Sequence, residues 1–377
     1  MAVNEGMKFL LEMINCHTFN WSINKKSYEK CVFLIIDKFA QLGFSTEIIE
    51  TQSGPAIIGF KEGKKKKHLH FNGHYDVVPM IDNQTITSNN SLNSKAKVIY
   101  GRGSSDMKGG IVSIWLAMKE LINNNKYPSL SFSFSPDEEL GGNIGSKLLV
   151  EKVKTLLPVP DLIIIADSSY PYLLTGHRGA LWLQVSCETK KNYRFNCSSK
   201  CSSAFMLACL ISPLIEKEIK NYNIFDSFFG GNCTSSSSAT NIVSQKFSFS
   251  IDIRFSDNKI TKNIKNRLIS SIKQAVSKFE TDGYIISIKD KLFIPTCPDA
   301  EIPSFVFNTV KKFIPNCTYG IGKGYYDLRF FRNQFSCPSF ILGPGTSEQA
   351  HTAEEFIIIK NITDCAKVYT ALINNGC

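Results

Sequence analysis

The first part of the chain alternates between two hydrophobic patterns. Apolar positions recur with helical spacing in some segments, and short apolar runs bounded by polar or glycine residues stand between them. The predicted helices are 5–15, 27–42, 111–123 and 145–152, and the predicted strands are 46–50, 56–60, 68–71, 130–135 and 162–166. Strands that alternate with helices predict an α/β fold, in which a mixed, mostly parallel sheet carries helices on both faces.

The pattern changes after residue 177. Long strands are expected at 182–188 and 246–255 with a further strand at 284–289, and helices at 205–217 and 260–279. This order resembles a β-α-β-β-α-β unit and predicts an inserted, smaller α+β domain of the ferredoxin-like kind. The first pattern then returns, with a helix at 304–313, a strand at 339–342 and a closing helix at 360–374. We therefore expect a catalytic domain in two parts, 1–177 and 292–377, around a smaller domain at 178–291.

Two side chains that are able to bind a metal ion or a proton follow the apolar strand at 68–71. His74 comes after Gly73, and Asp76 follows two residues later. Because residues i and i+2 of an extended segment point to the same side, both side chains should face one site. A metal-binding imidazole oriented by a carboxylate is one interpretation, and an ordinary polar turn at a strand end is the other.

Other predicted strand ends and loops carry similar groups. Asp106 stands between glycines just before a helix, and Glu138 and Glu139 are adjacent at the end of a strand. Asp167 follows a wholly apolar strand, and His351 follows a glycine-rich turn. Adjacent carboxylates repel each other unless a cation or a proton lies between them. Since the carboxyl ends of parallel strands meet at one sheet edge, the chain predicts a metal site there.

Composition and charge narrow the function classes. The chain is 43% hydrophobic and 20% charged, as globular proteins are, and contains no apolar run long enough to cross a membrane. Its N-terminus lacks the pattern of a secretory signal, so a cytoplasmic location is expected, with the twelve cysteines reduced. The net charge of +10 includes the run 64–67, which we interpret as a solvated turn; no nucleic-acid motif accompanies it.

Taken together, these motifs resemble the M20 family of zinc peptidases and deacylases over nearly the whole chain. The matching segments are His74-Tyr75-Asp76-Val77-Val78-Pro79, Gly101-Arg102-Gly103-Ser104-Ser105-Asp106-Met107-Lys108-Gly109, Pro136-Asp137-Glu138-Glu139, Gly343-Pro344-Gly345 and His351-Thr352-Ala353-Glu354-Glu355. The length is similar to that of the compact deacetylase and desuccinylase branch.

The resemblance implies a role for each of these residues. One Zn²⁺ would take His74 and Asp167, the other Glu139 and His351, and Asp106 would bridge them before a cis peptide bond. Co²⁺ is a plausible substitute for either ion. Asp76 would orient His74, and Glu138 would be the general base that activates water. The implied reaction is hydrolysis of the amide bond of an N-acyl amino acid or small peptide.

Substrate-binding residues follow less directly. Arg254 matches a position where a guanidinium would hold a substrate carboxylate, although an ion pair within its strand is an equal alternative. Asn241 matches a second contact position or caps a strand, and Gly343 of the last signature is included as substrate-binding. The resemblance also implies that a homodimer through the smaller domain is an option.

Two departures from the family pattern keep alternatives open. Relatives carry a histidine early in the smaller domain that stabilises the oxyanion, whereas segment 188–199 has none; Arg194, Asn192 or Asn196 are candidates to replace it. Asp167 is an aspartate, as in the dipeptidase and aminopeptidase-like branch, which conflicts with the length. The alternatives are thus a dipeptidase-like enzyme or a member whose hydrolysis is altered or lost.

Overall fold

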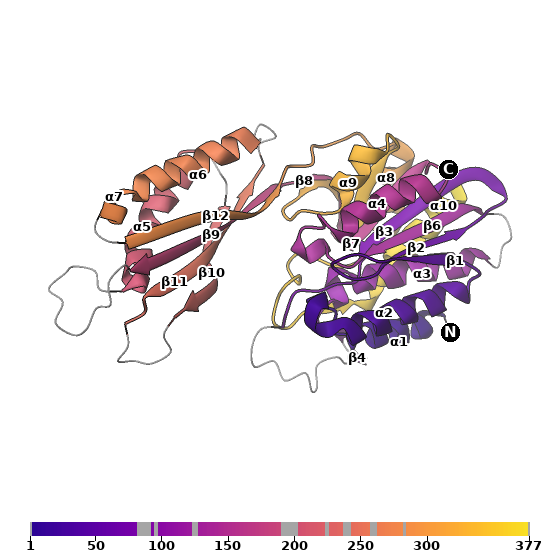
Figure 1. Cartoon of the computed structure of the whole chain (residues 1–377). Coiled ribbons are helices and arrows are strands. Elements are labelled where there is room, and N and C mark those ends of the chain that lie inside the picture. Colours follow the sequence, from indigo (N-terminus) through magenta and orange to yellow (C-terminus); the bar gives the residue numbers. More distant parts are fainter. Residues whose placement is uncertain are drawn as a thin grey trace. The chain divides into compact units, whose positions relative to one another are not determined.

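The computed structural model describes residues 2–80, 92–93, 97–122, 127–189, 203–222, 226–236, 243–256, 262–281 and 284–375. It separates into two compact units (Figure 1). The first contains residues 1–176, 299–322 and 326–377, and the second contains residues 177–298 and 323–325. Within the described residues, no helix combines the length and the apolar character needed to span a bilayer.

The first unit is built on an eight-stranded sheet in the order β1-β2-β6-β3-β7-β14-β8-β13. Its strands are β1 (Ser45–Ile49), β2 (Ala56–Lys61), β3 (Lys65–His74), β6 (Pro128–Ser135), β7 (Leu162–Ser168), β8 (Tyr172–His177), β13 (Thr318–Gly322) and β14 (Ser339–Gly343). The central strands β6, β3, β7 and β14 are parallel, while β1, β2 and β8 pair antiparallel. The predicted mixed, mostly parallel sheet is therefore confirmed.

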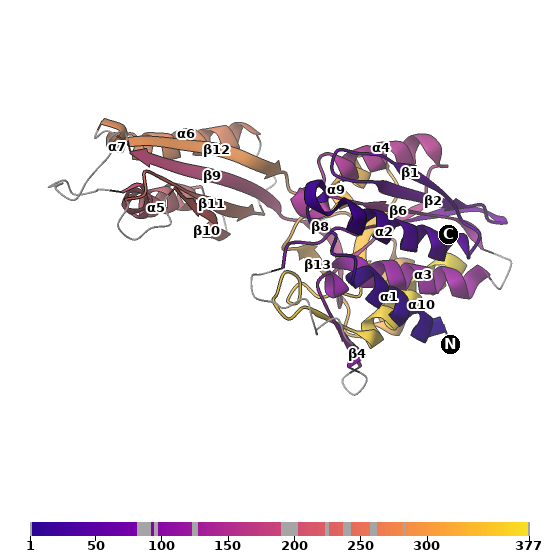
Figure 2. The same cartoon turned by 60° about the horizontal axis from the view of Figure 1, so that its bottom comes forward.

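Helices cover both faces of this sheet (Figure 2). The helices of the unit are α1 (Ala2–Ile14), α2 (Trp21–Ala40), α3 (Gly109–Ile122), α4 (Gly145–Leu156), α8 (Ser304–Phe313), α9 (Leu328–Gln334) and α10 (Ile359–Asn375). Side chains of α1, α2, α3, α8 and α10 share one large apolar core with alternate residues of β3 and β6. Helices α4 and α9 contact each other and the opposite face.

A small antiparallel sheet completes the first unit. It consists of β4 (Leu92–Asn93), β5 (Val98–Tyr100) and β15 (Phe356–Ile358), in the order β15-β5-β4. The pairing of β15 with β5 brings a late segment of the chain beside the segment that leads to Asp106.

The second unit has the expected β-α-β-β-α-β order. Its elements are β9 (Gly179–Thr189), α5 (Ala204–Lys220), β10 (Asp226–Ser235), β11 (Lys246–Phe255), α6 (Lys262–Val276), α7 (Lys278–Thr281) and β12 (Tyr284–Ile294). The sheet order β10-β11-β9-β12 is that of a ferredoxin-like fold, and α5 and α6 contribute to a core of its own. The smaller α+β domain is thereby confirmed.

Local chemistry explains two differences from the predicted elements. Helix α2 begins at Trp21, six residues before the expected start, because the Asn20 side chain accepts a hydrogen bond from the Ser22 amide at 3.2 Å and caps the helix. Strand β10 was not predicted, because its Gly-, Ser- and Asn-containing sequence reads as a loop; pairing with β11 makes it a strand.

The face of β3 and β6 that lies under α9 carries a buried row of polar side chains instead of an apolar layer. Along both strands, successive residues point alternately into the apolar core and into this row. Residues paired in register point to the same side. The members, all nearly or fully buried, are His68, His70, Asn72, Ser131 and Ser133.

The hydrogen bonds of this polar row admit one arrangement of protons. The Nδ1 of His68 lies 2.9 Å from the carbonyl oxygen of Pro158, so it is the protonated nitrogen, and its Nε2 accepts from the Ser131 hydroxyl at 2.6 Å. The Ser131 oxygen then accepts from Nδ1 of His70 at 2.7 Å. By the same logic Nε2 of His70 accepts from Ser133 at 2.8 Å. Both imidazoles are therefore held neutral.

Protonation of either imidazole would disrupt this row. A second N–H on His70 would point at the Ser133 hydroxyl, whose own proton would then lose its acceptor, Nε2 of His70. Burial also lowers the pKa of His70 well below its usual value and lowers that of His68. At acidic pH these two histidines consequently bind more protons in the unfolded chain than in the folded one, so their contribution to stability falls as the pH falls.

Through His68 and His70, acidification is expected to lower the free energy of unfolding once the pH falls below about 6.5, by up to about 1.4 kcal/mol per pH unit for each histidine. Guanidinium chloride unfolding of the metal-free protein and of His70→Leu at about pH 7.5 and about pH 5.5 isolates this contribution, because groups with a raised pKa, such as His351, contribute equally to both proteins. His70→Leu removes one of the two histidines while keeping every other titrating group, so its loss should be smaller. Equal losses in the two proteins would contradict the prediction.

Candidate metal centre

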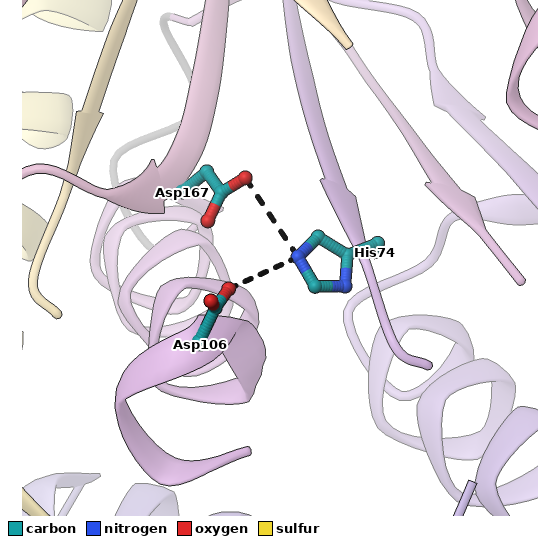
Figure 3. A group of neighbouring side chains, drawn as sticks. All are labelled: His74, Asp106 and Asp167. Carbon is teal, nitrogen blue, oxygen red and sulfur yellow. Dashed lines mark hydrogen bonds and ion pairs between the residues drawn. The ribbon is translucent and has the colours of Figure 1, made fainter. Parts of the chain in front are cut away.

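His74 ends β3 with its ring oriented by the residue two positions on. Its Nδ1 lies 3.1 Å from the carbonyl oxygen of Asp76 and 3.4 Å from the Asp76 carboxylate, so Nδ1 carries the proton. Its Nε2 points the other way, 3.2 Å from Asp106 and 3.7 Å from Asp167 (Figure 3). Three potential ligand atoms, from β3, from the segment that leads into α3 and from β7, thus meet at one place.

Asp106 faces two groups of side chains at once. It lies in the segment Ser104–Lys108 that leads into α3, and the peptide bond to Met107 is cis. One carboxylate oxygen faces His74, and the other lies 3.5 Å from Nε2 of His351. Asp106 therefore has the orientation expected of a carboxylate shared by two cations.

The second group combines Glu139, His351 and Asp106. Glu139 stands in a 3-10 turn, Glu138–Leu140, directly after β6, and its carboxylate lies 2.9 Å from His351. Each of the two groups, His74–Asp106–Asp167 and Asp106–Glu139–His351, offers three ligand atoms within 4.8 Å of one another. Imidazole nitrogens and carboxylate oxygens at such spacing are the donors that zinc takes in proteins.

Asp76 has a second set of contacts that the sequence did not reveal. Its carboxylate accepts hydrogen bonds from the backbone amides of Glu138 at 3.2 Å and Glu139 at 3.1 Å. The same side chain that faces His74 therefore also holds the turn of the two glutamates. No spacing pattern could have indicated this contact, because the partners stand more than sixty residues apart.

Excess negative charge marks the centre. Burial, followed by the charge of Asp106, raises the pKa of Glu139 to about 7 and also raises that of Asp167. Burial alone lowers the pKa of His74, yet the surrounding carboxylates, Asp167 first, raise it well above its usual value. These shifts arise from burial and from repulsion among the carboxylates, which the nearby His74 and His351 offset only in part. Divalent cations would supply the missing positive charge, so the residues fit metal ions.

Glu138 lies beside the two groups without belonging to either. It is 5% exposed, and its Oε1 has no hydrogen-bond partner in the described part of the chain. Burial, with help from the charges of Asp167, Asp327 and Glu139, raises the pKa of its carboxyl well above the usual range. Such a carboxyl is a stronger base than an exposed glutamate.

Asp327 is a further acidic neighbour that the sequence analysis passed over. It precedes α9, is buried, and accepts from the Ser135 hydroxyl at 3.0 Å. Burial raises its pKa to about 6, and its charge in turn acts on Glu138. Its segment, Gly320 to Asp327, looked like a plain loop in the sequence.

The structure describes only some of the predicted substrate-binding residues, and it places these in structural contacts. Asn241 and Arg194 lie outside the described residues. Arg254 pairs with Asp252 of its own strand at 2.7 and 2.8 Å and lies over the Tyr325 ring, which is the ion-pair alternative stated above. Gly343 packs so tightly on the backbone of Ala166 and Asp167 that a Cβ there would lie 2.3 Å from their carbonyl oxygens. A close approach of two strands therefore explains this glycine.

Comparisons with known proteins agree with this geometry. The chain is 25% identical over 360 residues to succinyl-diaminopimelate desuccinylase of Rickettsia bellii (strain OSU 85-389), covering 90% of this chain and 89% of that protein. Among solved structures, human carnosine dipeptidase 1 superposes with a TM-score of 0.80 at 15% identity, covering 98% of this chain and 96% of that one. The dipeptidase Dug1p of Saccharomyces cerevisiae superposes with a TM-score of 0.81 at 14% identity, covering 99% and 97%.

At such low identity the structural similarity establishes the fold, and the family comes from the sequence. The model of peptidase family M20/M25/M40 matches residues 70–375, which include all seven residues proposed for the centre. Since this match spans most of the chain, the protein belongs to peptidase family M20/M25/M40 and is a metal-dependent amidohydrolase or peptidase.

Proposed function

We propose that the protein is a two-zinc hydrolase that cleaves the amide bond of an N-acyl amino acid or a small peptide. The observation that carries this proposal is the pair of three-residue groups that share Asp106. His74 and Asp167 would hold one ion, Glu139 and His351 the other, and Asp106 both. Zinc bound there, or cobalt in its place, supplies Lewis acidity and a water of lowered pKa.

Side chains of the protein then handle the protons. Glu138 takes the proton of the attacking water on its buried carboxylate and later gives it to the leaving amine. Its raised pKa supports this role, because a carboxylate with a higher proton affinity is a better base. Asp76 keeps the Glu138 amide in place and holds the His74 proton on Nδ1. Neither step requires a residue outside the first unit.

The substrate class is the finer part of the proposal. We keep Arg254, Asn241 and Arg194 as proposed contacts of a substrate carboxylate or carbonyl in the second unit. The identity of residue 167 as aspartate favours dipeptides, whereas the length and the desuccinylase relative favour N-acyl amino acids. Both substrate classes therefore belong in the test.

Zinc- or cobalt-loaded protein is expected to hydrolyse at least one member of a panel of N-acetyl amino acids, N-succinyl amino acids and dipeptides. Removing the metal with a chelator should abolish this activity, and adding zinc back should restore it. Amine release and metal content are measured on the same samples. Two metals bound per chain without turnover of any panel member would refute hydrolysis and favour a member that lost it.

Glu138→Gln is expected to lower kcat by about 10² to 10⁴-fold, because the amide accepts no proton from water. Metal content should stay unchanged, since Glu138 belongs to neither ligand group. Glu151→Gln, at an exposed glutamate of α4, is the matched control and should behave as the unaltered enzyme. Retained turnover in Glu138→Gln would exclude it as the base.

We also propose a homodimer through the second unit. Apolar side chains Phe205, Met206 and Leu210 of α5 are 50%, 45% and 46% exposed, and Phe228 of β10 is 63% exposed. Strand β10 is an edge strand that pairs only with β11 among the described strands. An exposed edge beside apolar side chains is a typical docking surface for a second copy.

Sedimentation analysis should give twice the chain mass for the unaltered protein. Placing charges on the same helix, as in Phe205→Glu with Leu210→Glu, should give the single-chain mass without loss of helix content. A monomeric unaltered protein at micromolar concentration would exclude this dimer.

A further inference from the structure

Glu355 is a buried carboxylate whose every oxygen is occupied by donors from one distant loop. It is 3% exposed and stands four residues after His351. One oxygen accepts from the Arg102 guanidinium at 2.7 Å and from the Gly103 amide at 3.0 Å. The other oxygen accepts from the amides of Ser105 at 2.9 Å and Asp106 at 3.0 Å. No lone-pair direction remains for a role elsewhere.

The loop held in this way ends at the shared ligand. The amide bound to Glu355 is that of Asp106 itself, whose two carboxylate oxygens face His74 and His351. Gly103 adopts a φ of 84°, which turns successive amides toward a single acceptor. A shift of the Asp106 backbone would therefore move both of its oxygens relative to both groups of ligands.

The segment that carries Glu355 also carries a ligand. His351 lies on one side, and β15 on the other pairs with β5 immediately before the loop, where the Gly101 amide donates to the Glu355 carbonyl at 2.8 Å. Residues 351–355 thus provide one ligand by side chain and hold another by its backbone. This segment therefore connects the two groups of ligands.

We propose that Glu355 is the positioning residue of the metal centre: its carboxylate fixes the Asp106 loop and thereby sets the affinity of both metal positions. This inference rests on the proposed two-metal centre, but it concerns metal affinity and not the reaction. Residues that hold ligands in place typically contribute 10 to 100-fold to metal affinity.

Glu355→Gln tests the positioning role of the carboxylate while it keeps the size of the buried side chain. Glutamine has the same size, but its NH₂ group would face two of the four N–H donors, so one pair of hydrogen bonds is lost. The loop has independent anchors, because the Ser105 hydroxyl accepts from the Thr346 amide at 3.0 Å and the Ser168 hydroxyl donates to the Ser105 carbonyl at 2.9 Å. Glu355→Gln should therefore fold while its Asp106 shifts.

Glu354→Gln is the matched control. Glu354 is adjacent in sequence, exposed, and makes no hydrogen bond or ion pair with the described residues. Both variants and the unaltered protein are titrated with zinc against a competing chelator, and the metal-free proteins are unfolded with guanidinium chloride. The visible absorption spectrum of each cobalt-loaded protein reports ligand geometry directly.

Glu355→Gln is expected to bind zinc about 10 to 100-fold more weakly and to change the cobalt spectrum, whereas Glu354→Gln should match the unaltered protein. Unchanged zinc affinity and an unchanged spectrum in folded Glu355→Gln would overturn the proposal, even if its unfolding midpoint falls.

If Glu355→Gln does not fold, Arg102→Gln provides the second measurement. It removes one of the four donors and leaves three backbone amides, so a smaller loss of zinc affinity is expected, and no loss would overturn the proposal. These outcomes are independent of turnover: an unaltered protein that binds two metals without hydrolysing any substrate refutes the proposed function alone.

Discussion

The centre of the structure is organised by the repulsion among carboxylates buried at one sheet edge. Glu138 and Asp167 are buried and Asp106 and Glu139 are half-buried, and two imidazoles offset only part of their charge. Buried carboxylates are tolerated when donors or cations satisfy them. The surrounding fold supplies backbone amides to Asp76 and Glu355, and the family to which the chain belongs uses metal ions for the remainder.

The sheet positions this charge with a precision that apolar packing alone would not provide. On one face β3 and β6 contribute to a large apolar core, and on the other face their side chains form a closed row of hydrogen bonds. A slip of β3 by one residue would place His70 in the core and leave two serine hydroxyls unsatisfied. That row therefore fixes the register in which His74 lies opposite Ser135, three residues before Glu138.

Much of the fold could be predicted because its signals are local. The alternation of helical and extended patterns indicated the parallel sheet, and the changed pattern after residue 177 indicated the smaller domain. Strand β10 and helix α9 were missed for physical reasons: β10 is a strand through its pairing with β11, and α9 is a short helix. The start of α2 depended on a side-chain cap at Asn20, which periodicity does not reveal.

The sequence by itself determined which groups leave the strand ends and to which family they point, since motif order and the period of two are properties of neighbouring residues. It also determined that His74 and Asp76 face one side. Only the tertiary structure decided that Asp76 holds the glutamate turn and that Glu355 holds Asp106. Those contacts join backbone amides to carboxylates as many as 249 residues apart, so they follow from strand register and loop geometry and leave no trace in local spacing.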